Sequence, residues 1–71
     1  MKIIIKIKFD AGKQKIESFG NNRYLVYLTS KKEDPSSMDE FVNMMSKYMT
    51  VPPNRVHFKG KEGESFVFEI D

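Results

Sequence analysis

Alternating hydrophobic and polar residues mark the first segment of the chain as a β-strand. From Lys2 to Phe9, apolar side chains recur at every second position and lysines take most of the positions between them. Successive side chains of a strand point to opposite faces of its sheet, so this pattern predicts one buried face and one solvated face. The buried set is Ile3, Ile5, Ile7 and Phe9, and the opposite set is Lys2, Ile4, Lys6 and Lys8.

Two further strands are expected before the middle of the chain. Asp10–Lys13 predicts a turn, and Gln14–Phe19 predicts a short second strand. Gly20–Asn22 then supplies residues that tolerate a positive φ angle, which favours a tight hairpin into the next strand. That third strand is predicted at Arg23–Thr29, a segment rich in aromatic and β-branched residues.

An amphipathic helix is predicted after a polar connection at residues 30–37. Ser37–Glu40 fits a capping box, in which the serine hydroxyl and the glutamate carboxylate each bond an unpaired amide at the helix start. Val51–Pro53 ends the helix, because proline has no amide hydrogen and disfavours helical geometry in the residue before it. We interpret the methionines of this segment as core residues, although methionine also suits adaptable binding surfaces. One apolar stripe runs through Phe41, Met44, Met45, Tyr48 and Met49.

The chain is expected to form one domain, residues 1–71, with the element order β-β-β-α-β-β. The last two strands are predicted at Arg55–Lys59 and Ser65–Ile70, around a hairpin loop at Gly60–Glu64. The fold class is α+β, with a mixed or antiparallel five-stranded sheet and one amphipathic helix on one face. A helix of about 12 residues is ~18 Å long and ~10 Å wide, whereas five strands span ~19 Å. We expect uncovered apolar sheet surface, sealed by the residue 30–37 loop or by another molecule.

Composition and charge exclude several kinds of site. The 71 residues include no cysteine and one histidine, which excludes disulfides, thiolate metal sites and polyhistidine sites. Residues 1–32 carry eight bases and two acids (8 − 2 = +6), and residues 33–71 carry four bases and eight acids (4 − 8 = −4). Such asymmetry suits either a polyanion-binding face or charge pairing within the fold or between subunits, and we favour the pairing. A domain this small often depends on a partner subunit for stability.

No segment predicts a membrane span or a signal peptide. The longest apolar run, Ile3–Ile5, is far shorter than the ~20 residues that a spanning helix needs. Lysines interrupt the apolar stretch at the N-terminus, which is atypical of a signal peptide. We therefore expect a cytoplasmic protein with no membrane partner.

The sequence predicts no catalytic, cofactor or metal site. His57 is the one side chain suited to act as a base near neutral pH. It is predicted to lie in a strand with Arg55 and Lys59 on the same side, so we interpret it as a surface residue. The carboxylates of Asp39 and Glu40 suit a helix start, and the four glycines are too dispersed to form a phosphate-binding loop. The expectation is a protein that is not an enzyme.

Several stretches of the chain resemble the YggU-like family of uncharacterised small proteins. The resemblance is carried by the opening Lys-Ile-Ile-Ile-Lys-Ile-Lys, the strand at Tyr24–Leu28, the helix, the segment Lys47–Val56 and Gly60. It covers nearly the whole chain in element order and spacing. It implies a two-layer fold with a mixed sheet and a family whose biochemical role is undefined. No functional residue is carried over, because the segments before the helix and after Gly60 differ from the family pattern.

The sheet face turned away from the helix is the main functional candidate, and two interpretations of it stay open. A basic face could follow a nucleic-acid backbone while a tyrosine stacks on a base, which predicts RNA or single-stranded DNA binding. An apolar centre ringed by cations is also typical of a protein interface, and the commonest such interface joins identical subunits. We favour a non-enzymatic interaction module that forms a homodimer, with nucleic-acid binding as the alternative. The candidate nucleic-acid contacts are Lys6, Lys8, Tyr27, Arg55 and Lys59, and the candidate interface residues are Ile4, Leu25, Tyr27 and Val67.

Overall fold

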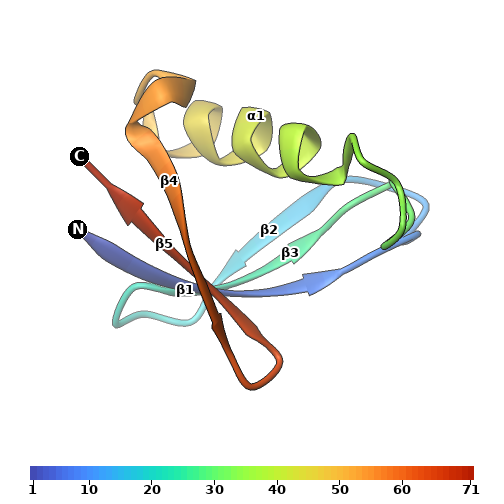
Figure 1. The fold of residues 1–71 in the computed structure, drawn as a ribbon, viewed down its shortest axis with the longest axis horizontal. Coiled ribbons are helices and arrows are strands. Elements are labelled where there is room, and N and C mark those ends of the chain that lie inside the picture. The colour runs from blue at the N-terminus through green and yellow to red at the C-terminus, as the bar shows by residue number, and fades with distance from the viewer.

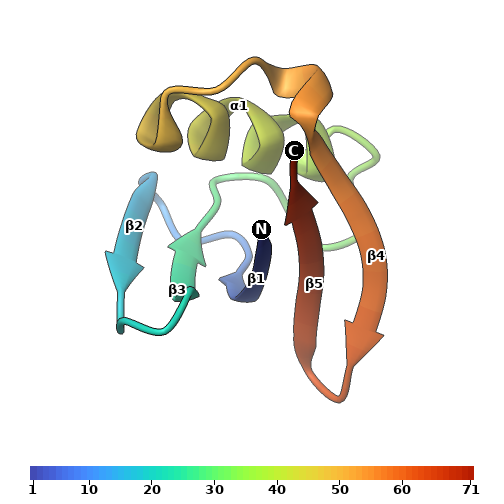
Figure 2. The same ribbon diagram turned by 90° about the vertical axis from the view of Figure 1, so that its left-hand side faces the viewer.

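A computed structural model describes all 71 residues and confirms the predicted α+β fold. The five strands form one mixed sheet in the order β2-β3-β1-β5-β4, with β1 parallel to β3 and the other neighbours antiparallel. Helix α1 lies on one side of this twisted sheet, and the turn of the β4–β5 hairpin points away from it (Figures 1 and 2). The elements are β1 (Lys2–Lys8), β2 (Lys15–Ser18), β3 (Arg23–Tyr27), α1 (Ser37–Met49), the 3-10 helix η1 (Pro53–Arg55), β4 (Val56–Glu62) and β5 (Ser65–Ile70).

The predicted alternation of side chains builds the hydrophobic core. Ile3 and Ile5 of β1 are completely buried, as are Phe41 and Met45 of α1. The rings of Phe41 and Phe68 pack with their centroids 4.4 Å apart, which joins α1 to β5. Each apolar side chain of this size contributes about 1.5–3 kcal/mol when fully buried. The remaining core residues are Val26, Leu28, Val56 and Ile70, and Ile7 and Phe9 pack against them from the end of β1.

The β2–β3 hairpin forms as predicted. Gly20, Asn21 and Asn22 all have positive φ angles, of 79°, 53° and 59°. Arg23 donates its N–H to the carbonyl of Gly20, and Phe19 donates its N–H to the carbonyl of Arg23, which closes the turn. Residues that tolerate the left-handed region therefore occupy the positions that require it.

The predicted bounds of the fourth strand are wrong at both ends. Arg55 belongs to η1 rather than to the strand, because the two prolines before it favour a tight helical turn. Gly60 and its successors up to Glu62 lie in β4 rather than in a loop, and the connection to β5 is only the two-residue turn Gly63–Glu64. The pairing with β5 shifts by one residue between Phe58 and Gly60. Lys59 is therefore the extra residue of a β-bulge, a feature that a strict period-2 pattern does not contain.

The predicted capping box at the start of α1 is also absent. The N-cap residue is Ser36, whose side chain makes no capping hydrogen bond. The carboxylate of Asp34 instead accepts hydrogen bonds from the N–H and hydroxyl of Ser36, and these bonds lower the pKa of Asp34. Glu40 turns away from the helix start because it has better donors elsewhere, at the end of β3.

Glu40 joins the first turn of α1 to the sheet through hydrogen bonds. Its carboxylate accepts the backbone N–H of Thr29 at 2.9 Å and that of Ser30 at 2.9 Å. The Thr29 hydroxyl donates at 2.7 Å and the Gln14 amide at 2.8 Å. Burial opposes the charged form of Glu40, but these hydrogen bonds outweigh it and hold the pKa of the carboxyl far below its ordinary value of 4.5. The anion is therefore the form that holds α1 in place.

Replacement of this carboxylate tests its contribution to stability. We expect Glu40→Gln to lower the free energy of unfolding by about 1–2 kcal/mol at neutral pH, a value that allows for partial solvent screening. The measurement is urea denaturation followed by circular dichroism. Asp39→Asn is the matched control, because Asp39 lies in the same helical turn, and its replacement should cost only a few tenths of a kcal/mol.

The same contact predicts a pH dependence. The pKa of Glu40 is lower in the folded protein than its ordinary value of 4.5. The contribution of Glu40 to the free energy of unfolding is therefore fully present above pH 4.5, and it decreases as the pH falls from 4.5 toward the folded-state pKa. The difference in unfolding free energy between the wild-type protein and Glu40→Gln should therefore shrink in acid. A difference that stays constant from neutral pH down to pH 3 would show that the charge of Glu40 does not stabilise the fold.

Candidate functional site

The four predicted interface residues lie together on the outer face of the sheet, away from α1. Ile4 is paired with Val67 across β1 and β5, and Leu25 and Tyr27 are paired with lysines of β1. Val67 is only 7% exposed, and the other three are partly buried. The patch is continuous, but it presents little apolar surface. The cations on the same face are Lys2, Lys6, Lys8, Lys15 and Arg23, and its acids include Glu17 and Glu69.

The five predicted nucleic-acid contacts do not form one site. Lys6, Lys8 and Tyr27 are neighbours in β1 and β3, but the Tyr27 hydroxyl donates to Glu17 at 3.4 Å. Lys15 Nζ also lies 5.8 Å from the centroid of the Tyr27 ring. Arg55 lies at the opposite end of the sheet, where its carbonyl accepts the N–H of Asp71. The fifth residue, Lys59, is the bulge residue of the edge strand β4.

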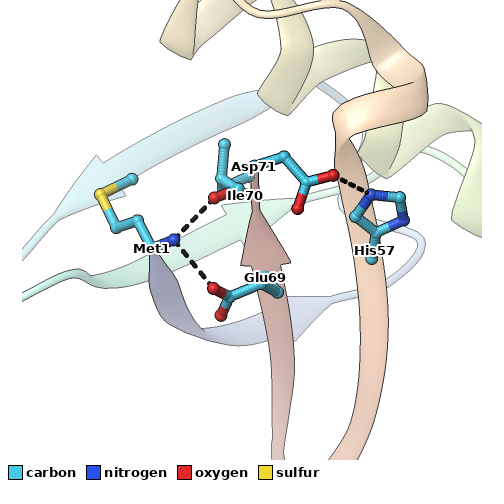
Figure 3. Close-up of polar contacts among 5 residues, drawn as sticks. All are labelled: Met1, His57, Glu69, Ile70 and Asp71. Atoms are coloured by element: carbon cyan, nitrogen blue, oxygen red, sulfur yellow. Dashed lines mark hydrogen bonds and ion pairs between the residues drawn. The ribbon is translucent and has the colours of Figure 1, made fainter.

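His57 lies beside two acids, Asp71 and Glu69. Its Nε2 lies 2.8 Å from the carboxylate of Asp71, and its partner across the β4–β5 pair is Glu69 (Figure 3). The amino group of Met1 donates to the Glu69 carboxylate at 2.9 Å and to the Ile70 carbonyl at 2.6 Å. None of the three hollows in the protein surface is lined by His57. The structure places no substrate-sized space beside this imidazole.

Two further observations concern metal sites and membrane crossing. No three histidine or carboxylate side chains come close enough together to hold a metal ion. Helix α1 has 13 residues and is neither long enough nor apolar enough to cross a lipid bilayer.

An aromatic groove opens on the helix side of the sheet, between the start of α1 and strand β4. It encloses about 410 Å³. Its most exposed apolar residue is Phe58, which keeps 53% of its surface accessible although it points to the same face as the core residue Phe68. The ring of Phe58 lies 5.4 Å from that of Phe68 and 6.2 Å from that of Phe66. The apolar residues of the groove are Phe9, Met38, Val42, Val56, Phe58, Phe66 and Phe68.

The β-bulge at Lys59 directs a lysine to this same face. Without an extra residue, the alternation after Phe58 would direct residue 60 toward the helix side and residue 61 away from it. The shifted pairing instead places Lys61 opposite Phe66, with its Nζ 5.0 Å from the centroid of the Phe66 ring. Gly60 adopts a φ of 131°, a conformation that residues with a side chain rarely adopt. The bulge thus adds a positive charge to the end of an apolar groove.

A lysine notch adjoins the groove at the end of β1 and encloses about 340 Å³. The notch shares Phe9, Lys32, Lys61 and Phe66 with the groove. It forms because the β1–β5 pairing ends at Ile5 and Phe66, after which β1 and the β4–β5 hairpin diverge (Figure 1). Its cations are Lys6, Lys8, Lys32 and Lys61, and its one acid is Glu64.

Sequence reasoning found part of these surfaces and missed the rest. The mismatch between one helix and five strands predicted uncovered apolar surface, and Phe58 provides it. The bulge hid the role of Lys61, which the sequence analysis assigned to the hairpin loop Gly60–Glu64. Lys32 was missed because it lies in an irregular connection, where the sequence pattern gives no direction to the side chain.

Comparison with protein-family models, with characterised proteins and with solved structures finds no match to this chain. The resemblance to the YggU-like family stays a prediction.

The exposure of Phe58 predicts that this ring contributes little to folding. At low micromolar protein concentration, we expect Phe58→Thr to change the free energy of unfolding by no more than about 1 kcal/mol. Phe68→Ala, on the neighbouring strand, should cost about 3–5 kcal/mol because it opens a cavity in the core. Urea denaturation of the two variants checks the contrast. Similar losses in both variants would show that Phe58 belongs to the core.

Proposed function

We propose that this protein is a non-enzymatic interaction module that forms a homodimer through sheet surface that α1 leaves uncovered. The observation that carries this proposal is the aromatic groove with Phe58 half exposed at its edge. Burying the exposed half of such a ring contributes about 1 kcal/mol, and a two-fold contact counts this contribution twice. A second copy would also supply the stability that a 71-residue domain without disulfides lacks.

The groove region is suited to contact a copy of itself. In a two-fold interface the same patch appears on both subunits, so Phe58 of one copy can enter the groove of the other. Along the β4–β5 hairpin, Lys59 and Lys61 precede Glu62 and Glu64. If the two-fold axis is perpendicular to the strands, the two hairpins run antiparallel and the lysines of one copy approach the glutamates of the other. The bulge and the edge lysines disfavour continuous backbone pairing, so the contact is made by side chains.

The outer-face patch supports self-association less well. Lys6 and Arg23 flank Ile4 without a salt bridge, and a two-fold contact centred on Ile4 would bring these like charges together. Val67 is already buried within the single chain, so little apolar area is left to gain. We therefore assign the contact to the groove.

Sedimentation velocity across protein concentrations tests the homodimer. We expect a concentration-dependent dimer in the wild-type protein and at least about tenfold weaker association in Phe58→Thr, since two exposed rings are removed per dimer. Phe19→Thr is the matched control, because Phe19 is 64% exposed and lies outside the groove. A wild-type protein that stays monomeric at millimolar concentration would contradict the proposal. So would dissociation caused by Phe19→Thr and not by Phe58→Thr.

Binding of RNA or single-stranded DNA is the second candidate function. One observation favours it: none of the lysines of the notch takes part in a salt bridge. Unpaired cations around a hollow attract polyanions, whose binding releases counterions. Of the residues predicted for this role, Lys6 and Lys8 line the notch, whereas Tyr27, Arg55 and Lys59 do not.

A further inference from the structure

We infer that the lysine notch binds the phosphate groups of single-stranded RNA or DNA. This inference rests on the second candidate function and does not require the homodimer. The proposed ligand group is the phosphate. The proposed site consists of Lys6 and Lys8 from β1 together with Lys32 and Lys61, and the sequence analysis did not identify the last two.

The notch is a consequence of where the sheet divides. Ile4 donates its N–H to the Asn22 carbonyl, and the Lys8 carbonyl accepts the N–H of Leu28. The backbone groups of even-numbered β1 residues therefore face β3, and those of Ile5 and Ile7 face β5. The pairing with β5 ends at Ile5, so the N–H of Ile7 points into the notch with no strand beside it. A backbone N–H in this position can donate to a phosphate oxygen.

Positive charge converges on the notch from three elements. Lys6 and Lys8 reach it from the outer face of β1, Lys32 from the loop before α1, and Lys61 from the helix side of β4. All four side chains are exposed, and the one acid among the lining residues is Glu64. Lys6 and Lys8 are two residues apart on a strand, about 7 Å, which is comparable to the separation of successive phosphates in an extended single strand.

Apolar surface inside the notch favours a nucleic acid over a simple anion. Phe9 and Phe66 meet there edge to face, with ring centroids 6.4 Å apart, and Leu25 lines the opposite side. The bases of a single strand are free to pack on such surface while the phosphates meet the lysines. A duplex keeps its base faces stacked inside and offers phosphates, sugars and base edges instead. The notch therefore selects single strands over duplexes.

Fluorescence anisotropy with a labelled oligouridylate or oligothymidylate of about ten nucleotides tests the site. With four lysine–phosphate contacts, the slope of log affinity against log salt should be about −3, since each contact on a single strand contributes about −0.7. The variant Lys6→Gln/Lys8→Gln should bind at least about tenfold more weakly, with the slope reduced to about −1.5. Lys32→Gln/Lys61→Gln should behave in the same way.

Arg55→Gln/Lys59→Gln is the matched control, because it removes two charges outside the notch. We expect its affinity to stay within about twofold of the wild-type value. Equal losses in the control and in the notch variants would show that only total charge matters and would overturn the site. All of the replaced side chains are exposed, and circular dichroism confirms that the variants remain folded.

Competitors and oligomeric state separate this inference from its alternatives. Excess inorganic phosphate should displace the strand weakly, and a polyglutamate of similar length should displace it less than unlabelled oligouridylate. Displacement by polyglutamate equal to that by oligouridylate would overturn the nucleic-acid assignment and identify an acidic protein segment as the ligand. Phe58→Thr should still bind the strand, and Lys6→Gln/Lys8→Gln should still dimerise. Loss of strand binding in Phe58→Thr would place the nucleic acid at the dimer contact and overturn the notch.

Discussion

One helix of 13 residues has to cover a sheet of five strands, and the position of that helix decides which apolar surface stays exposed. Glu40 sets the position by binding the backbone of Thr29 and Ser30 at the end of β3. With its start fixed there and Phe41 packed on Phe68, α1 covers the centre of the sheet. The β4–β5 hairpin projects beyond this cover (Figure 2). Phe58 is exposed because no element is left to cover it.

The sequence predicted the elements whose pattern is regular. Alternation placed Ile3 and Ile5 in the core, and the helical stripe placed Phe41 and Met45 opposite them. The order of the strands did not follow from the pattern, because alternation assigns faces and leaves the neighbours of each strand undetermined. The capping-box prediction failed because Glu40 has two backbone donors in the Thr29–Ser30 segment, which is distant from α1 in the sequence.

The β-bulge explains why the candidate site was harder to predict than the fold. One extra residue reverses the face of every later residue in its strand, so an unmarked bulge makes the alternation misleading from Lys59 onward. Gly60 is the only residue in the sequence that indicates the bulge. A glycine before an acidic turn is equally typical of a loop. The same reversal places Lys61 between the groove and the notch. The positive charge of Lys61 contributes to both proposed binding surfaces. A partner bound at the groove therefore changes the electrostatic potential at the notch, and a partner bound at the notch changes it at the groove.

The strand order has a consequence for how the molecule folds. The first and last strands, β1 and β5, are adjacent at the centre of the sheet. Their paired residues are separated by nearly the full length of the sequence. Until β5 arrives, Ile3 and Ile5 have no neighbour on that side, and closing so large a loop carries an entropic penalty. On a ribosome, the β2–β3 hairpin and α1 can form early, but the core cannot close until synthesis reaches residue 70. The nascent chain therefore exposes the isoleucines of β1 for most of its synthesis, and exposed apolar side chains of this kind favour aggregation until the core closes.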